Sequence, residues 1–135
     1  EKDPQQLILI KKLCEDLNFN IKIISCPTIR EKNGLAMSTR NHYLNSQEKI
    51  NASIIYKSLM MIKDLLKNNE TSIISLKKKL EMSLLTCPNL KIDYISFANA
   101  NNLKELKTVL AKNLLISVAV FIGKTRLIDS FFYKL

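Results

Sequence analysis

The 135-residue sequence lacks the features of a membrane, secreted or zinc-binding protein. Its most apolar stretch, residues 114–122, is nine residues long, well short of the roughly 20 residues that cross a bilayer. No signal peptide is visible in the residues shown. The three cysteines, Cys14, Cys26 and Cys87, are odd in number and lack the spacing of metal ligands. They are predicted to be reduced residues of a cytoplasmic protein, and neither a disulfide nor a metal site is expected.

The chain also lacks a complete nucleotide-binding P-loop. Residues 123–125 are Gly-Lys-Thr and follow the apolar stretch, as the end of a P-loop does. That motif needs another glycine five positions earlier, where this chain has Val118, and a helix directly after it. Phe131 and Phe132 follow instead, and they are poor residues to open a helix. No nucleotide-binding role is therefore predicted for this tripeptide.

Acidic residues are few compared with basic ones. Lysine and arginine total 21 against 12 acidic residues, which gives a formal net charge of +9. Such a charge favours anionic partners, and a nucleic-acid-binding domain is one alternative function. The lysines are scattered, however, with only residues 77–79 forming a run, and aromatic residues are few. A solvated helix face explains that run, so no nucleic-acid partner is predicted.

The first part of the chain is predicted to contain a helix and a strand. Asp3 and Pro4 form a good helix start, because aspartate caps exposed amides and proline fits the first helical position. Apolar residues then share one face at helical spacing: Leu7, Ile10, Cys14 and Leu17. Residues 18–20 end this helix, and residues 21–25 are predicted to form a buried parallel strand leading into a loop at 27–37. This order is typical of an open α/β sheet.

From Leu44 onward the pattern predicts a small α+β module. Ser46 can cap a helix that reaches Lys67, with an apolar side made of Ile50, Ile54, Met61 and Leu65. Thr71 can cap a second helix, closed by Pro88, with an apolar side made of Ile73, Leu76, Leu80 and Leu84. Strands are predicted at 91–98, 114–122 and, more briefly, 125–129, with a polar connection at 99–107. Two helices followed by strands favour an α+β module, hinged to the first part near Leu44.

The most informative segment, residues 34–41, reads Gly-Leu-Ala-Met-Ser-Thr-Arg-Asn. Hydroxyls and backbone N–H groups can hold phosphate oxygens, and Arg40 offers a planar fork that binds them through two hydrogen bonds. A helix opening near Ser38 would add its N-terminal amides to the same anion site. The segment therefore predicts a loop that closes over a polyphosphate. The alternative is a helix start capped by Ser38 or Thr39, with Arg40 in solvent.

Three segments together resemble the pantoate–β-alanine ligases, or pantothenate synthetases. Residues 1–6 are similar to that family's Gly-Glu-Lys-Asp-x-Gln-Gln segment, and residues 27–41 to its Pro-Thr-x-Arg-Glu-x-x-Gly-Leu-Ala-Met-Ser-Ser-Arg-Asn segment. Residues 123–129 are similar to its Gly-x-Thr-Arg-Leu-Ile-Asp ending. The family's His-x-Gly-His motif does not occur, because His42 is the only histidine. The chain is therefore expected to be the C-terminal half of such an enzyme.

The resemblance implies a fold and an activity. Residues 1–44 would be the C-terminal segment of a Rossmann-like, nucleotidyltransferase-type parallel-sheet domain in an α/β protein. Residues 45–135 would be a small α+β lid of two helices and an antiparallel sheet. The complete enzyme would be a cytoplasmic homodimeric ligase that uses ATP and Mg²⁺ to join pantoate to β-alanine through a pantoyl adenylate. This chain alone is expected to be inactive, and the alternative is a non-catalytic lid or dimerisation module.

The resemblance also assigns site residues. Lys2 would approach the nucleotide and stabilise charge during adenylation, and Lys2 and Arg40 are the predicted catalytic residues. Asp3 would accept hydrogen bonds from the ribose hydroxyls, Gln6 would hold pantoate, and the backbone of Ile29 would meet the adenine edge. The remaining ATP-binding residues lie at or beside the phosphates: Met37, Ser38, Thr39 and Arg40.

Two positions depart from the family pattern. Pro4 stands where the family usually has an aromatic residue, which keeps the helix start but removes ring contacts and one N–H. Thr39 replaces the second serine and keeps the hydroxyl, so phosphate binding should survive. Without the resemblance, Lys2 and Asp3 would be interpreted as a capped helix start and Gln6 as part of a solvated first turn.

Overall fold

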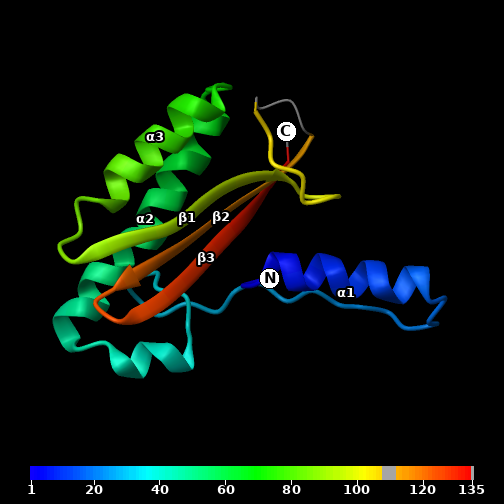
Figure 1. The fold of residues 1–135 in the computed structure, drawn as a ribbon, viewed down its shortest axis with the longest axis horizontal. Helices are drawn as coiled ribbons and strands as arrows, with labels where there is room; N and C mark the ends of the chain where they lie inside the picture. Colours follow the sequence, from blue (N-terminus) through cyan, green and yellow to red (C-terminus); the bar gives the residue numbers. More distant parts are fainter. Residues whose placement is uncertain (108–111, 135) are drawn as a thin grey trace.

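An antiparallel sheet with strand order β1-β2-β3 lies at the centre of the computed structural model, which describes residues 1–107 and 112–134 (Figure 1). The strands are β1 (Leu90–Asn99), β2 (Asn113–Ile122) and β3 (Thr125–Lys134). β2 pairs with a strand on each side, and its residues 114–120 are all buried. The strands predicted at 91–98 and 114–122 are confirmed, whereas the third runs further than the predicted 125–129. Residues 108–111 and 135, which fall in the predicted second domain, lie outside the described residues.

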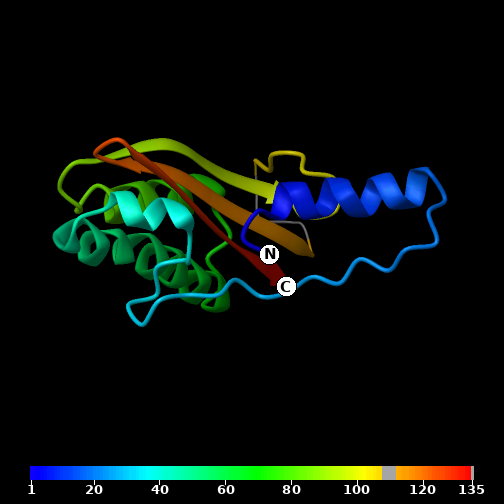
Figure 2. The same cartoon turned by 90° about the horizontal axis from the view of Figure 1, so that it is seen from below.

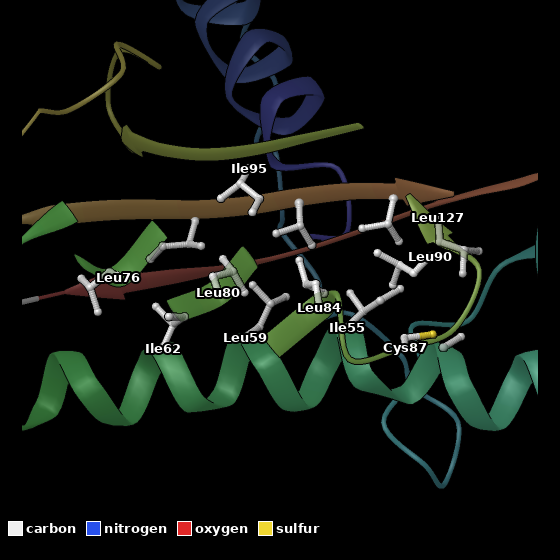
Figure 3. Packing of buried hydrophobic residues seen from close by; sticks show 14 of the residues in the cluster. Ile55, Leu59, Ile62, Leu76, Leu80, Leu84, Cys87, Leu90, Ile95 and Leu127 are labelled. Atoms are coloured by element: carbon white, nitrogen blue, oxygen red, sulfur yellow. The ribbon is translucent and has the colours of Figure 1, made fainter. Parts of the chain in front are cut away.

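Two helices cover one face of this sheet, as Figure 2 shows from below. They are α2 (Ser46–Lys67) and α3 (Ile73–Leu84). Figure 3 shows Ile55, Leu59 and Ile62 projecting from α2 into the space between helix and sheet, where Leu80 of α3 meets them. This layer of fully buried aliphatic side chains forms the core and confirms the predicted α+β module. Within the described residues, no helix is both long and apolar enough to cross a membrane.

The apolar side of α3 is as predicted, but that of α2 is displaced by one residue. The side chains of α3 that are buried are Ile73, Leu76, Leu80 and Leu84. The predicted side of α2 is wrong, because Ile50 is 61% exposed and Ile54, Met61 and Leu65 are only partly buried. The buried side instead contains Ile55, Leu59, Ile62 and Leu66. Pairs of adjacent apolar residues along α2 give both sides the same helical spacing, so periodicity alone could not choose between them.

Both predicted caps in this region are also displaced by one residue. Asn45, not Ser46, caps α2, and its side chain and that of Glu48 form a capping box. Ser72, not Thr71, caps α3, with its side chain accepting the N–H of Ser75 at 3.3 Å. Asparagine, serine and threonine all cap well, so neighbouring candidates compete for the position.

The first 28 residues form one helix and an extended return. Helix α1 (Pro4–Asp16) begins as predicted, with Asp3 as its cap and Pro4 at its first position, and it points away from the sheet (Figure 1). The predicted parallel strand at 21–25 is wrong for this chain, because these residues are extended but pair with no other strand, and the described residues form no parallel sheet. A parallel strand is held by hydrogen bonds to its neighbours, and none is available here.

Candidate functional site

The loop after Cys26 folds into a small hairpin. Arg30 and Ala36 form an antiparallel bridge, and the N–H of Met37 donates to the carbonyl of Ile29 at 2.9 Å. Gly34 turns this hairpin with a φ of +92°, a left-handed conformation that favours glycine. A Cβ atom on Gly34 would collide with the Tyr56 ring on α2. The hairpin therefore lies directly against α2, and only glycine allows that approach.

A buried ion pair joins the hairpin to β3. The guanidinium of Arg30 donates from Nη1 and Nη2 to the two oxygens of Asp129, at 2.6 and 2.9 Å. Asp129 is 3% exposed, and it also accepts the backbone N–H of Ser130. Arg30 lies 4.4 Å from the centre of the Tyr56 ring and donates to the carbonyl of Gly34. A paired, hydrogen-bonded carboxylate of this kind fixes the position of both partners.

The predicted phosphate segment continues into a short 3₁₀ helix, η1 (Thr39–Tyr43). The hydroxyl of Ser38 accepts the N–H of Arg40 at 3.2 Å, and the side chains of Thr39 and Arg40 are exposed. Asn41 is buried and donates to the side chain of Glu31 and to the carbonyl of Ala36, at 2.8 and 3.2 Å. The geometry of the capped-start interpretation is thus present, and it leaves the Arg40 fork open to solvent.

The start of α1 lies against this segment. The ammonium of Lys2 donates to the carbonyl of Met37 at 2.6 Å, and one oxygen of Asp3 accepts the N–H of Gln6 at 3.1 Å. Burial lowers the pKa of Lys2 below its ordinary value, the carboxylate of Asp129 opposes that change, and the like charge of Arg40 adds to it. Lys2 therefore sits in a partly desolvated, positively charged position.

Four of the predicted site residues line one pocket of about 530 Å³: Lys2, Asp3, Gln6 and Arg40. Ser38 borders a much smaller recess together with Lys2 and Arg40. Ile29, Met37 and Thr39 line neither space among the described residues, although the Met37 carbonyl holds Lys2. The structure therefore brings Lys2, Asp3, Gln6, Ser38 and Arg40 together from two segments more than 30 residues apart.

Sequence reasoning missed three charged residues at this place. Arg30, Arg126 and Asp129 belong to recognisable motifs, but nothing in their spacing indicates that they meet. In the structure, Arg126 and Asp129 line the small recess with Arg40, and Asp129 binds Arg30. Arg30 and Asp129 lie 99 positions apart, in two different motif-like segments. The only signal in the sequence is that one segment carries a basic residue and the other an acidic one.

The fold and this pocket define a class of protein: an α+β domain joined to a helix start and a loop, whose Lys2 and Arg40 can hold an anionic ligand. The pantoate-beta-alanine ligase family model matches residues 1–132, and the chain belongs to this family. Relatives named pantothenate synthetase include one from Syntrophomonas wolfei, 46% identical over 130 residues, and one from Clostridium botulinum strain Loch Maree, 48% identical over 135 residues. The matches cover 96% and 100% of this chain, and 46% and 48% of those proteins.

Solved structures agree with this membership. A pantothenate synthetase from Thermus thermophilus is 29% identical, with a TM-score of 0.88 over 97% of this chain and 47% of that one. A pantoate–β-alanine ligase from Francisella tularensis, complexed with β-γ ATP and β-alanine, is 34% identical, with a TM-score of 0.58 over 97% of this chain and 41% of that one. The chain thus spans about half the length of the relatives it matches.

Proposed function

We propose that this chain is the C-terminal portion of an enzyme that condenses pantoate with β-alanine, using ATP and passing through a pantoyl adenylate. One observation carries the proposal: Lys2, Asp3, Gln6 and Arg40 line a single pocket. Family membership supports the same conclusion, as does the Francisella relative complexed with β-γ ATP and β-alanine. The alternative of a lid or dimerisation module without catalytic residues has no specific observation in its favour.

The reaction asks the protein for alignment and charge stabilisation. The pantoate carboxylate attacks the α-phosphorus of ATP and pyrophosphate leaves, after which the amine of β-alanine displaces AMP from the adenylate. No covalent nucleophile is required of the protein. Lys2 would stabilise the charge on the α-phosphate, where its partial burial strengthens the interaction, since electrostatic attraction is stronger outside bulk water. Arg40 would grip the phosphates with its exposed fork, beside the hydroxyls of Ser38 and Thr39.

The first turn of α1 would receive the remaining groups. Gln6 presents a carboxamide that can both donate to and accept from pantoate. One oxygen of Asp3 already caps the helix, and the other is available to the ribose hydroxyls. The Ile29 carbonyl accepts a bond from Met37, so an adenine contact at Ile29 would use the remaining lone pair or the N–H.

Magnesium is proposed to accompany ATP, but no residue of this chain is assigned to it. The described residues contain no group of three or more histidine, cysteine, aspartate or glutamate side chains that could hold a metal ion. Magnesium in phosphate-transfer sites is commonly held by a few carboxylates plus the substrate's own phosphates. We further propose a domain boundary near Leu44, a homodimer and a cytoplasmic location. The last is supported by the free state of all three cysteines.

The test is Arg40→Ala in the full-length protein, with Lys67→Ala as a matched control. Arg40 lines the pocket, whereas Lys67 pairs with Asp64 at the far end of α2. Because a charge-assisted hydrogen bond contributes roughly 1.5–3 kcal/mol, Arg40→Ala should slow adenylate formation by about ten- to a hundredfold. Lys67→Ala should leave the rate unchanged. If the unaltered protein makes no pantothenate, the proposed function is wrong; equal rates in both variants would make Arg40 a solvated surface residue.

A further inference from the structure

Positive side chains from four places in the chain gather where the hairpin and η1 meet β3. Lys2, Arg40 and Arg126 line one recess around the buried carboxylate of Asp129, which Arg30 holds through two hydrogen bonds. Arg30 comes from the hairpin, Arg40 from η1 and Arg126 from β3, while Lys2 precedes α1. The cluster thus brings two residues proposed to bind ATP, Lys2 and Arg40, next to β3, a strand to which no role has been given.

The charges in this cluster do not balance. Arg30 forms its ion pair with Asp129 and Arg126 forms one with Asp93, at 2.6 and 2.8 Å. Among the described residues, Lys2 and Arg40 take part in no ion pair. Two positive charges are therefore left in excess beside the paired ones. Such an excess favours a ligand with several negative charges.

Arg126 shares the recess with Lys2 and Arg40, and it lines a second space with Arg40. It lies next to the turn between β2 and β3, and together with Arg40 and Lys124 it lines a groove of about 710 Å³. One carboxylate, that of Glu48, also lines the groove, but it accepts the backbone N–H of Asn45 at 2.8 Å in the capping box of α2. The groove is thus lined by two arginines and by a carboxylate that already accepts a hydrogen bond from the protein.

The ion pair that now holds Arg126 is easily exchanged. Its Nε and Nη2 both donate to a single oxygen of Asp93, and the two side chains are 40% and 38% exposed. Asp93 is the extra residue of a bulge between Ile92 and Tyr94 of β1. An exposed ion pair of this kind changes an equilibrium by at most about fivefold, and a phosphate carries more negative charge than a single carboxylate. A phosphate that reaches the groove therefore competes well for Arg126.

We propose that Arg126 is a further phosphate-binding residue, which leaves Asp93 and binds the β- and γ-phosphates of ATP together with Arg40. This inference rests on the proposed function. In the adenylation step, the pantoate oxygen forms a bond to the α-phosphorus while the bond to the bridging oxygen breaks. Pyrophosphate then departs with that electron pair. Arg126 stabilises the charge that grows on this leaving group.

The experiment compares Arg126→Gln with Asp93→Asn in the full-length enzyme, because the two partners are expected to act in opposite directions. Arg126→Gln should raise the KM for ATP and the inhibition constant of inorganic pyrophosphate by about tenfold, with the KM for β-alanine unchanged. Asp93→Asn should leave both constants unchanged or lower them by up to about fivefold, because it frees Arg126. The double variant should behave like Arg126→Gln. Lys91→Gln, which removes a charge from β1 outside these pockets, is the control.

Two results would overturn the inference. If Arg126→Gln and Asp93→Asn raise the KM for ATP equally, the pair is only a structural contact between β1 and β3. If neither variant changes it, Arg126 does not meet the nucleotide. Arg126→Lys, which keeps the charge but loses the fork, gives a second measurement if Arg126→Gln unfolds, and it should fall between the native enzyme and Arg126→Gln. An inactive native protein would instead contradict the proposed function, so the two failures are distinguishable.

Discussion

Residues 45–107 and 112–134 bury most of their apolar side chains, whereas residues 1–28 leave most of theirs in solvent. Leu59 and Ile62 of α2 are fully buried, while Leu13 of α1 is 53% exposed and Ile24 of the extended return is 74% exposed. Both regions carry helical or strand-like apolar patterns in the sequence. The difference shows that such a pattern states what a segment can bury, not whether a surface is present to receive it. In the proposed longer enzyme, the parallel sheet would provide that surface.

Residues 1–28 meet the α+β domain at the candidate site, and the loop that follows them adds Leu35, which is 3% exposed, to the hydrophobic core. The hairpin carrying Arg30 is fastened to Asp129 of β3 and to the ring of Tyr56, and Lys2 reaches the carbonyl of Met37. These contacts are polar, specific and few. Together with the burial of Leu35, they hold the loop against the α+β domain. Substitutions in the core, at the Arg30–Asp129 ion pair and in α1 should therefore have separable effects.

The largest effect is expected in the hydrophobic core between the helices α2 and α3 and the sheet. Leu59→Ala should lower the free energy of unfolding by about 2–5 kcal/mol, because it leaves a cavity at a fully buried position. Leu13→Ala on α1 should change it by less than about 0.5 kcal/mol. Urea unfolding of the two variants measures both. Equal losses would show that the exposed face of α1 is covered in solution, and the comparison between the two regions would fail.

Sequence reasoning succeeded for the start of α1 and the buried side of α3, although the caps of α2 and α3 lie one residue from the predicted positions. Asp3 and Pro4 start α1 as predicted, and the buried side of α3 is as predicted, because capping chemistry and helical spacing act over a few residues. It failed at residues 21–25, because a parallel strand needs neighbours to pair with and the described residues provide none there. It also failed on the buried side of α2, where two apolar sides were equally spaced and only the sheet's position chooses between them.

The candidate site shows the same division. The residues in one pocket, Lys2, Asp3, Gln6 and Arg40, were assigned from motifs, and the structure brings them together. The pairing of Arg30 with Asp129 joins residues 99 positions apart in the sequence, and no local sequence pattern predicts a contact of that kind. The assigned roles of all these residues stay predictions until they are measured.

The next largest effect is expected at the ion pair between Arg30 of the hairpin and Asp129 of β3. Asp129→Asn should lower the free energy of unfolding by about 2–3 kcal/mol, somewhat less than for a fully buried pair because the Arg30 side chain is 20% exposed. The matched change Asp93→Asn breaks an exposed ion pair and should lower it by at most about 1 kcal/mol. Chemical unfolding again provides the measurement. A smaller loss for Asp129→Asn than for Asp93→Asn would mean that the hairpin is not fastened to β3.

A smaller effect is expected where the hairpin lies against α2. Gly34→Ala should lower the free energy of unfolding by about 1–3 kcal/mol, because the left-handed φ becomes strained and the new methyl group meets the Tyr56 ring. Gly123→Ala is the control, since its φ is +57° and the nearest atom is the flexible end of Glu48 at 3.3 Å. It should lower the free energy of unfolding by only about 1 kcal/mol. Equal losses would indicate that backbone strain alone acts at Gly34 and that the approach to Tyr56 is not tight.

The smallest effect concerns the charge of Lys2, and it tests whether Lys2 is electrostatically coupled to Arg40 and Asp129. Burial lowers the pKa of Lys2, the carboxylate of Asp129 raises it and the charge of Arg40 lowers it. Removing one neighbour at a time should therefore move this pKa in opposite directions: upward in Arg40→Gln and downward in Asp129→Asn. An NMR titration of the Lys2 side chain measures each shift directly, and Asp93→Asn is the control.

The same pKa fixes the sign of a small pH dependence of stability. Between the lowered pKa of folded Lys2 and its ordinary value of 10.5, the unfolded chain binds more protons at this position than the folded chain does. The contribution of Lys2 to stability is therefore least favourable below that window and rises with pH through it. Lys2→Gln should remove this rise, seen as the difference between the two unfolding free energies across the alkaline range. If the unfolding free energies of the native chain and of Lys2→Gln change in parallel there, Lys2 titrates as an ordinary exposed lysine. Its ammonium would then not be coupled to the charges of Arg40 and Asp129.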